Sequence, residues 1–286
     1  MITQWWTALP PVPALTRLGI RSAPTADGRV ETALDFGTLW KGAGVAGLAA
    51  LLCDAATGLA VGTLEPDRAL STAMLGVQVT GHPHPAGQIR AVAAPAARRG
   101  DYVLATASVL DDLDTEFARA TSWWAVRGPR GAQPTGTPTG PGPAPPVSSG
   151  PDTCPADPTR TPFGRALGLT GFRRDLDGTS FELADPTPFH NRSATLHGGL
   201  GALLAELAAV AAVDDGVRTP EVLSLNCHYL RAAGPGPEPV RVRGHRVRSG
   251  RTSGVARGEV AAPDGRPAVL ADVTVAFLAS TDGRKR

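Results

Sequence analysis

A proline-rich segment divides this chain into two parts of nearly equal length. Between Pro129 and Pro162 there are eleven prolines, interspersed with glycine, serine and threonine, and Val147 is almost the only aliphatic residue. Such a composition cannot bury a core, so we expect a semi-extended linker here. The 286 residues therefore predict domains at 1–127 and 162–279, joined by a linker at 128–161 and followed by a tail at 280–286.

The two parts repeat one pattern, and this repeat is the main evidence for how the chain folds. Each begins with a short amphipathic segment, followed by two strand-like segments around an Asp-Gly turn, at Asp27-Gly28 and at Asp177-Gly178. Each continues with one long apolar helix and ends with four strands. We expect helices at 44–62 and 197–214, and strands at 69–79, 87–97, 102–111, 116–126, 221–230, 239–248, 252–262 and 267–278.

The predicted helices are apolar on almost every side. The first contains Val45, Leu48, Leu51, Leu52 and Leu59 with alanines between them, which leaves almost no polar face. Such a helix must be buried on most sides, and four antiparallel strands bury it best when their sheet wraps around it. We therefore predict an α+β fold of two antiparallel sheets, each wrapped around a central helix, that pair edge to edge as an intrachain pseudo-dimer.

Charge and cysteine content argue against several classes of protein. A formal net charge of +2 gives no basis for nucleic-acid binding. Cys53, Cys154 and Cys227 form no Cys-x-x-Cys pair, and His82 and His84 lack an acidic or cysteine partner, so we expect no disulfide and no metal site. The longest apolar runs are short for a membrane span and each contains an acid. No secretory signal is visible, which predicts a cytoplasmic protein without membrane contact.

One set of polar residues carries chemical information. Asn191 is followed after six positions by His197-Gly198-Gly199, after nine more by Glu206, and then by Ser224 near the start of the next strand. This set and its spacing resemble the hotdog-fold acyl-CoA thioesterases of the phenylacetyl-CoA and hydroxybenzoyl-CoA group. The resemblance covers about 11–127 and 162–279 and implies a tandem, or double, hotdog fold. It also implies an acyl-CoA substrate, with CoA as part of the substrate and no separate cofactor.

The first part carries only half of this set. When Asp54 is aligned on Glu206, Thr72 falls on Ser224. Aliphatic residues, however, stand where the second part has its Asn and its His. The first part therefore has the acid and the strand hydroxyl but lacks the other two groups.

Helix geometry indicates how these groups combine. His197 and Glu206 lie nine residues apart on one predicted helix, so they point to opposite sides and are separated by roughly 13–14 Å along its axis. In a pseudo-two-fold pair, however, the acid of one helix can face the amino end of the other. We therefore predict one complete composite site and one degenerate site. The complete site contains Asn191, His197, Gly198, Asp54 and Thr72, and the degenerate site contains Glu206 and Ser224.

The charge that develops during thioester hydrolysis suggests a role for each group. Attack on the carbonyl creates an oxyanion, which the free amide of Gly198 at a helix amino end can stabilise. Asp54 acts as general base on a water molecule or as the nucleophile itself. We expect Asn191 to hold the carbonyl or the water, Thr72 to orient the water, and His197 to fix the loop by hydrogen bonding.

The phosphates of CoA require positive charge near the mouth of the site. Two strand turns offer it, with Arg98 and Arg99 in the first part and Arg248, Gly250 and Arg251 in the second. The segment Arg-Ser-Gly-Arg-Thr at the second turn resembles the CoA-contacting loop of the family.

Two other functions remain compatible with the sequence. Hotdog enoyl-CoA hydratases or dehydratases usually carry an Asp and a His close together on the loop and helix start, whereas Asn191 and the glycines after His197 favour hydrolysis. A non-catalytic acyl-CoA-binding module is conceivable because the first part lacks the Asn and the His. Trp123 and Trp124 are expected to pack in the core, with an acyl pocket as the alternative. Paired hotdog domains commonly assemble further, so we expect a homodimer of pseudo-dimers.

Overall fold

The computed structural model describes residues 11–37, 40, 43–84, 87–129, 157–176 and 178–278. Within these residues, the order strand, strand, helix and four strands occurs twice. The eight strands that follow the two long helices begin within two residues of their predicted starts. Most of the predicted linker, the tail and the turn residue Asp177 lie outside the described residues, so the domain boundaries stay a prediction.

The elements of the two halves correspond one to one, apart from short turns of helix. The first half contains α2 (Pro13–Arg17), β1 (Arg21–Pro24), β2 (Val30–Phe36), α3 (Val45–Leu64), β3 (Arg68–Val79), β4 (Gly87–Arg99), β5 (Tyr102–Leu110) and β6 (Glu116–Pro129). The second half contains η2 (Pro158–Arg160), α4 (Pro162–Leu167), β7 (Leu169–Arg174), β8 (Thr179–Leu183), η3 (Thr187–Phe189), α5 (Gly198–Val213), β9 (Thr219–Tyr229), β10 (Val240–Ser249), β11 (Ser253–Ala261) and β12 (Pro267–Leu278). Each half thus has one long helix and six strands among its described residues.

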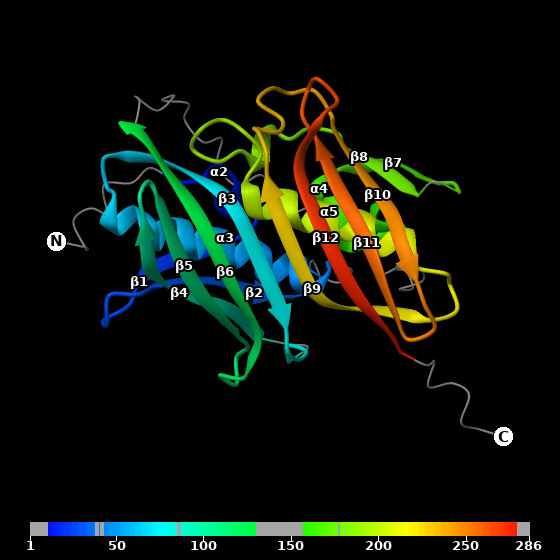
Figure 1. Ribbon diagram of the computed structural model, residues 1–286, viewed down its shortest axis with the longest axis horizontal. Coiled ribbons are helices and arrows are strands. Elements are labelled where there is room, and N and C mark those ends of the chain that lie inside the picture. The colour runs from blue at the N-terminus through cyan, green and yellow to red at the C-terminus, as the bar shows by residue number, and fades with distance from the viewer. Residues whose placement is uncertain are drawn as a thin grey trace.

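The strands of both halves form one continuous antiparallel sheet (Figure 1). Their order is β1-β2-β4-β5-β6-β3-β9-β12-β11-β10-β8-β7. At the centre β3 pairs with β9, from Met74 opposite His228 to Gln78 opposite Ser224. The predicted count of two sheets is therefore wrong. The edge strands of the two halves hydrogen-bond to each other, which removes two exposed edges and leaves one sheet of twelve described strands.

Both long helices lie on the same face of this sheet and pack against each other (Figure 1). They run antiparallel, because Gly47 of α3 contacts Glu206 of α5 while Gly199 of α5 contacts Asp54 of α3. By length and composition α3 could cross a membrane, but 83% of its apolar window is buried inside the protein. Burial against the sheet and the other helix accounts for its apolar surface.

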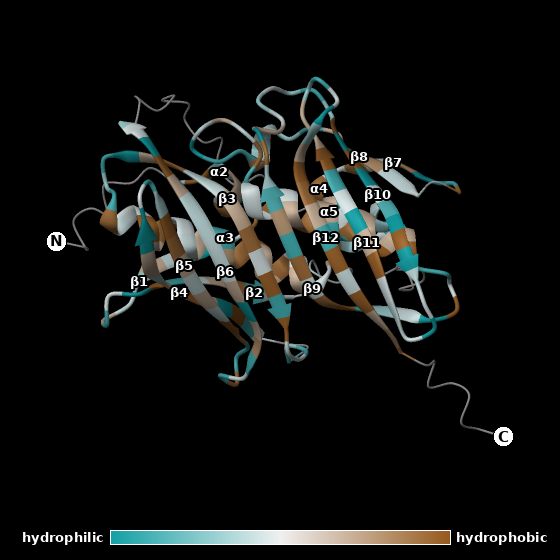
Figure 2. Ribbon diagram, in the orientation of Figure 1, coloured by the Kyte–Doolittle hydropathy of each residue, from teal (hydrophilic) through white to brown (hydrophobic). Residues whose placement is uncertain are grey.

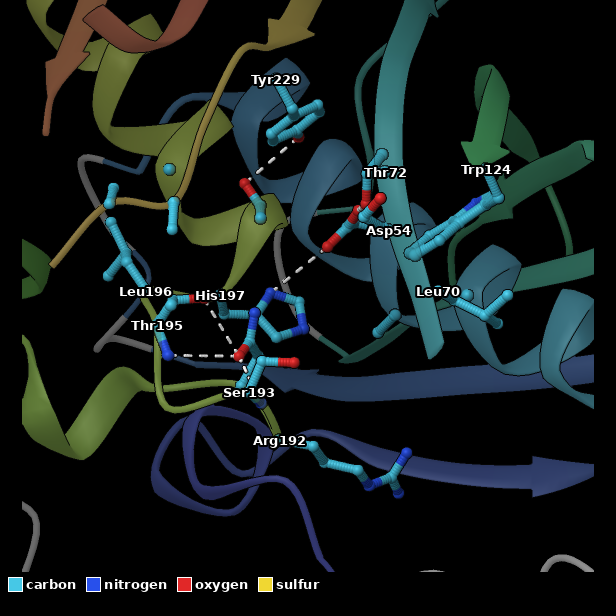
Figure 3. A pocket seen from close by; sticks show the side chains of 18 of the residues that line it. Asp54, Leu70, Thr72, Trp124, Arg192, Ser193, Thr195, Leu196, His197 and Tyr229 are labelled. Atoms are coloured by element: carbon cyan, nitrogen blue, oxygen red, sulfur yellow. Dashed lines mark hydrogen bonds and ion pairs between the residues drawn. The ribbon is translucent and has the colours of Figure 1, made fainter. Parts of the chain in front are cut away.

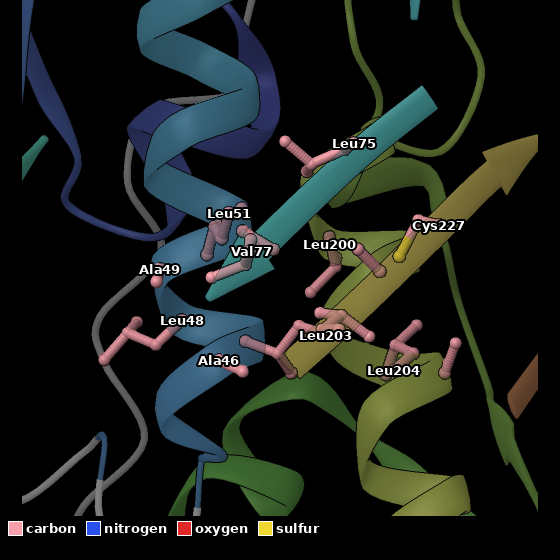
Figure 4. Packing of buried hydrophobic residues seen from close by; sticks show 14 of the residues in the cluster. Ala46, Leu48, Ala49, Leu51, Leu75, Val77, Leu200, Leu203, Leu204 and Cys227 are labelled. Atoms are coloured by element: carbon pink, nitrogen blue, oxygen red, sulfur yellow. The ribbon is translucent and has the colours of Figure 1, made fainter. Parts of the chain in front are cut away.

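The core fills the space between the helices and the sheet. Figure 4 shows Leu51 of α3, Val77 of β3 and Leu203 of α5 converging there, and all three are fully buried. Hydrophobic and hydrophilic residues alternate along the strands (Figure 2), because successive side chains point to opposite faces. The outer face carries exposed ion pairs such as Arg257 with Asp272, at 2.8 Å. Two long helices therefore meet under one sheet, and their contact positions the candidate site.

Candidate active site

Asp54 lies in the middle of the apolar helix α3 and is only 4% exposed. Its Oδ1 accepts a hydrogen bond from the hydroxyl of Thr72 on β3 at 2.8 Å. Its Oδ2 accepts a hydrogen bond from the N–H of Gly199 on α5, also at 2.8 Å. A buried carboxylate is costly unless it is hydrogen-bonded, and these two donors, one from each half of the chain, fix its orientation. Figure 3 shows Thr72 next to Asp54.

Helix α5 begins at this carboxylate with two glycines. A Cβ added at Gly198 would lie 2.9 Å from Asp54 Oδ2, and one at Gly199 would lie 2.6 Å from the Cα of Leu51. Only glycine therefore permits the helices to approach this closely. As the first residue of α5, Gly198 has an N–H with no acceptor inside the helix, and no described residue accepts a hydrogen bond from it. The free N–H of Gly198, at the amino end of α5, therefore lies next to the carboxylate of Asp54.

His197 precedes the helix and is almost fully buried. Its Nδ1 lies 3.5 Å from Asp54 Oδ2, yet no described residue forms a hydrogen bond with that nitrogen. Burial lowers the pKa of the imidazole more than the nearby Asp54 raises it, so the ring is neutral. The loop is held instead by the backbone N–H of His197, which donates to the carbonyl of Phe189 at 3.0 Å. The expected fixing of the loop comes from the backbone and does not involve Nδ1 of the ring.

Asn191 organises the loop that leads to His197. Its Oδ1 accepts hydrogen bonds from the N–H of Ser193 at 2.8 Å and from the N–H and the hydroxyl of Thr195 at 3.3 and 3.2 Å. The predicted role of holding a carbonyl or a water would require a donor or acceptor that is free. Its acceptor oxygen is occupied by the loop, so Asn191 positions that loop, and a hold on the substrate carbonyl through its Nδ2 donor stays a prediction.

A cleft of about 740 Å³ opens beside Asp54 between the two halves. It is lined by both central helices, by β3, β6 and β9, and by the loop before α5. Among the predicted site residues it contains Asp54, Thr72, Asn191, His197 and Gly198. The structure thus brings together every member of the predicted complete site. A volume of this size is typical of pockets that hold small molecules.

Two aromatic residues also line the cleft, Tyr229, which the sequence did not assign to the site, and Trp124, which it assigned only as an alternative. Tyr229 on β9 donates its hydroxyl to the carbonyl of Gly198 at 3.2 Å, and burial raises the pKa of this phenol well above its usual value. Tyr229 follows the buried Cys227 by two positions, so strand alternation could have placed it on the helix side. Trp124 on β6 also lines the cleft, which supports the alternative interpretation of that residue.

The degenerate site around Glu206 differs sharply from the first. Glu206 is fully buried and does not line the cleft. Its Oε2 accepts from the N–H of Gly47 at 2.9 Å, while its Oε1 has no hydrogen-bond partner among the described residues. Burial raises its pKa to about 7. A Cβ at Gly44 or Gly47 would collide with Oε2, so the acid sits directly against the start of α3.

Ser224 does not lie where the sequence alignment places it. The register of β3 shifts after Thr72, and that of β9 shifts between Val222 and Ser224. Val222 therefore occupies the structural position of Thr72. Ser224 lies on the same side of β9 as the exposed Asn226, away from the helices. The predicted pairing of Ser224 with Glu206 is wrong, because the chain between the helix acid and the strand bulge is two residues shorter in the second half: Glu206 precedes the bulged Leu223 by 17 positions, and Asp54 precedes the bulged Ala73 by 19.

The predicted CoA-contacting turns do not line the cleft either. Arg98 pairs with Glu65 at the carboxyl end of α3, and Arg99 is exposed on the same turn. The turn with Arg248, Gly250 and Arg251 lies at the other end of the sheet, where the carbonyls of Gly250 and Arg251 accept from Arg218. None of these five residues lines the cleft, and their contact with CoA stays a prediction. The cations that do line the cleft are Arg127, Arg192 and Arg231.

The described residues contain no cluster of three metal-binding side chains.

One family model matches part of the second half of the chain. Residues 186–279 match the family described as the acyl-CoA thioesterase N-terminal domain. This match includes Asn191, His197, Gly198 and Glu206 and covers about a third of the chain. No curated protein matches the chain.

Solved structures match almost the whole chain at low sequence identity. A hot dog fold protein of unknown function from Alicyclobacillus acidocaldarius is 15% identical, with a TM-score of 0.57 over 93% of this chain and 97% of that chain. A putative thioesterase from Novosphingobium aromaticivorans is 14% identical, with a TM-score of 0.58 over 87% and 96%. An acyl-CoA thioesterase II from Mycobacterium marinum is 11% identical, with a TM-score of 0.58 over 94% and 99%. The chain therefore has a hotdog fold, and residues 186–279 are similar to the acyl-CoA thioesterase N-terminal domain.

Proposed function

We propose that this protein is an acyl-CoA thioesterase that works at one composite site centred on Asp54. The observation that carries the proposal is the position of this carboxylate. It is held by Thr72 and Gly199 beside the unpaired N–H of Gly198, at the wall of a cleft. A base and an oxyanion donor are thus adjacent at one accessible place. The family match of the second half and the names of two structural neighbours support the same reaction class.

The proposed reaction uses water as the nucleophile. The thioester carbonyl oxygen accepts a hydrogen bond from the N–H of Gly198, and Asp54 removes a proton from a water molecule whose oxygen bonds to the carbonyl carbon. The negative charge then rests on the carbonyl oxygen at the amino end of α5, where the N–H and the helix dipole stabilise it. When the C=O bond re-forms, the C–S bond breaks, and the CoA thiolate takes the proton from Asp54. The products are a free acid and CoA.

The neighbouring side chains act through this carboxylate and the helix end. Thr72 donates to Asp54, so it positions the base and not the water. Tyr229 holds the carbonyl of Gly198, and Asn191 shapes the loop before it. In the alternative route Asp54 attacks the carbonyl itself and the resulting anhydride is hydrolysed. In a single turnover in heavy-oxygen water, label found in Asp54 would establish the anhydride route, because attack of water on the aspartyl carbonyl of the anhydride leaves the label there and the general-base route does not.

We assign the reaction to one of the two pseudo-symmetric sites. Glu206 is fully buried, lies outside the cleft and accepts no hydrogen bond from a hydroxyl of any described residue. No Asn or His precedes α3 at the equivalent positions. We propose that Glu206 has a structural role at the helix contact, and the resemblance to the phenylacetyl-CoA and hydroxybenzoyl-CoA group remains part of the proposal.

One observation favours a second candidate function. Asp54 and His197 lie 3.5 Å apart, and a neighbouring Asp and His are typical of hotdog enoyl-CoA hydratases. The match of residues 186–279 to an acyl-CoA thioesterase domain favours hydrolysis over hydration.

The test is a direct assay of both reactions. Free thiol is measured after addition of short, medium, long and aryl acyl-CoAs, and hydration is measured separately with an enoyl-CoA. We expect thiol release from at least one acyl-CoA and no hydration. Hydration without thiol release would establish the second function. Tight acyl-CoA binding without either reaction would identify a non-catalytic binding module.

A further inference from the structure

We propose that Trp124 limits the size of the acyl group, so that the protein acts on short or compact acyl-CoAs. This inference rests on the proposed function and adds a specificity-determining residue to it. Trp124 lies on β6 and lines the cleft, yet only 7% of its surface is exposed. Most of the indole is therefore packed inside the protein, and one part of it faces the space beside Asp54.

The indole is held rigidly between the sheet and helix α3. Its Nε1–H donates to the hydroxyl of Ser122 at 2.8 Å and to that of Thr57 at 3.2 Å. The far edge of the ring rests on the helix backbone, since a Cβ added at Gly58 would lie only 2.6 Å from Trp124 Cη2. The ring thus bridges the gap between β6 and α3. Because its N–H is hydrogen-bonded to two hydroxyls and its ring packs against the helix backbone, the indole cannot readily move aside for a longer ligand.

The ring stands close to the reacting centre. Gly58 follows Asp54 by four residues, so the two lie on the same face of α3 and about 6 Å apart along the axis. Figure 3 shows Trp124 and Leu70 on the side of Asp54 that is opposite to His197. An acyl group bound at the Gly198 N–H that extends towards this side meets the indole after about one helical turn. This spacing fits a short chain and obstructs a long one.

The lining on this side is suited to hydrocarbon. Ala55, Leu59, Leu70 and Trp124 line it together with glycines of α3. Arg127 lies there too, but it is exposed and its guanidinium donates to Ser71. Behind the indole is a separate small apolar cluster, which contains Val61, Val103, Ala105 and Val126. A smaller side chain at position 124 would therefore open the cleft into an apolar region.

The other side of the cleft carries most of its polar side chains, next to apolar residues such as Val12, Leu15 and Leu196. The loop before α5 contributes Asn191, Arg192, Ser193 and Thr195, and Arg231 follows β9. Cationic and hydroxyl groups suit the phosphates and amides of CoA better than they suit an alkyl chain. The two sides of Asp54 thus differ in chemistry, and the acyl group is assigned to the side with Trp124.

The experiment measures binding of a series of S-alkyl-CoA thioethers, from ethyl to decyl. These probes cannot be hydrolysed, so the result does not depend on turnover. The proteins are the wild type, Trp124→Leu and the milder Trp124→Phe. Trp123→Leu is the matched control, because Trp123 is the adjacent tryptophan on β6 and does not line the cleft. Circular dichroism establishes that each variant is folded.

We expect the affinity of the wild type and of Trp123→Leu to stop increasing at a short chain. For Trp124→Leu the affinity should continue to rise, by roughly fourfold for each further buried methylene, and Trp124→Phe should show a smaller change in the same direction. Identical chain-length profiles in wild type and both Trp124 variants would overturn the inference while leaving the proposed function intact. Failure of the wild type to bind any thioether would overturn both, since the proposed function also requires acyl-CoA binding.

Discussion

Glu206→Gln offers a prediction whose magnitude follows from the structure. Glu206 is fully buried, one of its carboxyl oxygens has no described partner, and burial raises its pKa to about 7 from a usual value of 4.5. Between these two pH values the folded protein binds more protons than the unfolded chain. The free energy of unfolding must then fall as pH rises through this window, and it should level out above pH 7.

The difference between 4.5 and about 7, at about 1.4 kcal/mol for each pH unit, corresponds to about 3 kcal/mol. Glutamine has nearly the shape of the protonated acid and does not titrate. The variant should therefore lack this contribution to the pH dependence. We compare the free energy of unfolding of Glu206→Gln with that of wild type at each pH. From about pH 4.5 to a pH well above 7, this difference should change in favour of the variant by up to about 3 kcal/mol.

The assay is denaturant-induced unfolding of wild type and Glu206→Gln at several pH values from about 4.5 to 8. Other titrating groups, including His197, are present in both proteins and cancel in the difference. If the difference in free energy of unfolding between the two proteins stays constant with pH, the pKa of Glu206 is not raised on folding. Glu206 would then be charged, or equally solvated, in the folded and the unfolded state. A difference of opposite sign would indicate that the contact with Gly47 stabilises the charged form.

Two further predictions concern the groups that surround Asp54. Thr72→Val removes the hydroxyl that donates to Asp54 and should lower kcat roughly tenfold or more in a thiol-release assay. Thr63→Val, which removes a hydroxyl outside the cleft, should leave kcat unchanged. Gly199→Ala should lower the free energy of unfolding by about 1–3 kcal/mol, because its Cβ would lie 2.6 Å from the Cα of Leu51. An undiminished denaturation midpoint would contradict that prediction.

Much of the fold could be predicted because local pattern and global packing agree. The apolar character of 44–62 and 197–214 and the alternation in the eight following strands each had one consistent interpretation. The number of sheets could not be predicted in the same way. It depends on the hydrogen bonds between β3 and β9, and strand patterns do not reveal whether two edges pair or only approach.

The candidate site was predictable where spacing on a helix determined it. Asp54, His197 and Gly198 meet because the helices cross antiparallel, which the pseudo-two-fold argument required. Ser224 was misplaced because an alignment without gaps from helix to strand ignores that this connection is two residues shorter in the second half, 17 positions from Glu206 to Leu223 against 19 from Asp54 to Ala73. The role of Trp124 depends on the glycine at position 58 of another element, and such a contact between distant segments is not visible in either segment alone.

The central claim is that hydrolysis occurs at Asp54 and not at Glu206. The most direct measurement is thiol release from the best acyl-CoA by wild type, Asp54→Asn and Glu206→Gln, each verified as folded by circular dichroism. We predict that Asp54→Asn loses at least about a hundredfold in kcat, as expected for removal of a general base, while Glu206→Gln retains most of the wild-type rate. Full activity in Asp54→Asn together with loss of activity in Glu206→Gln would mean that hydrolysis occurs at Glu206 and not at Asp54.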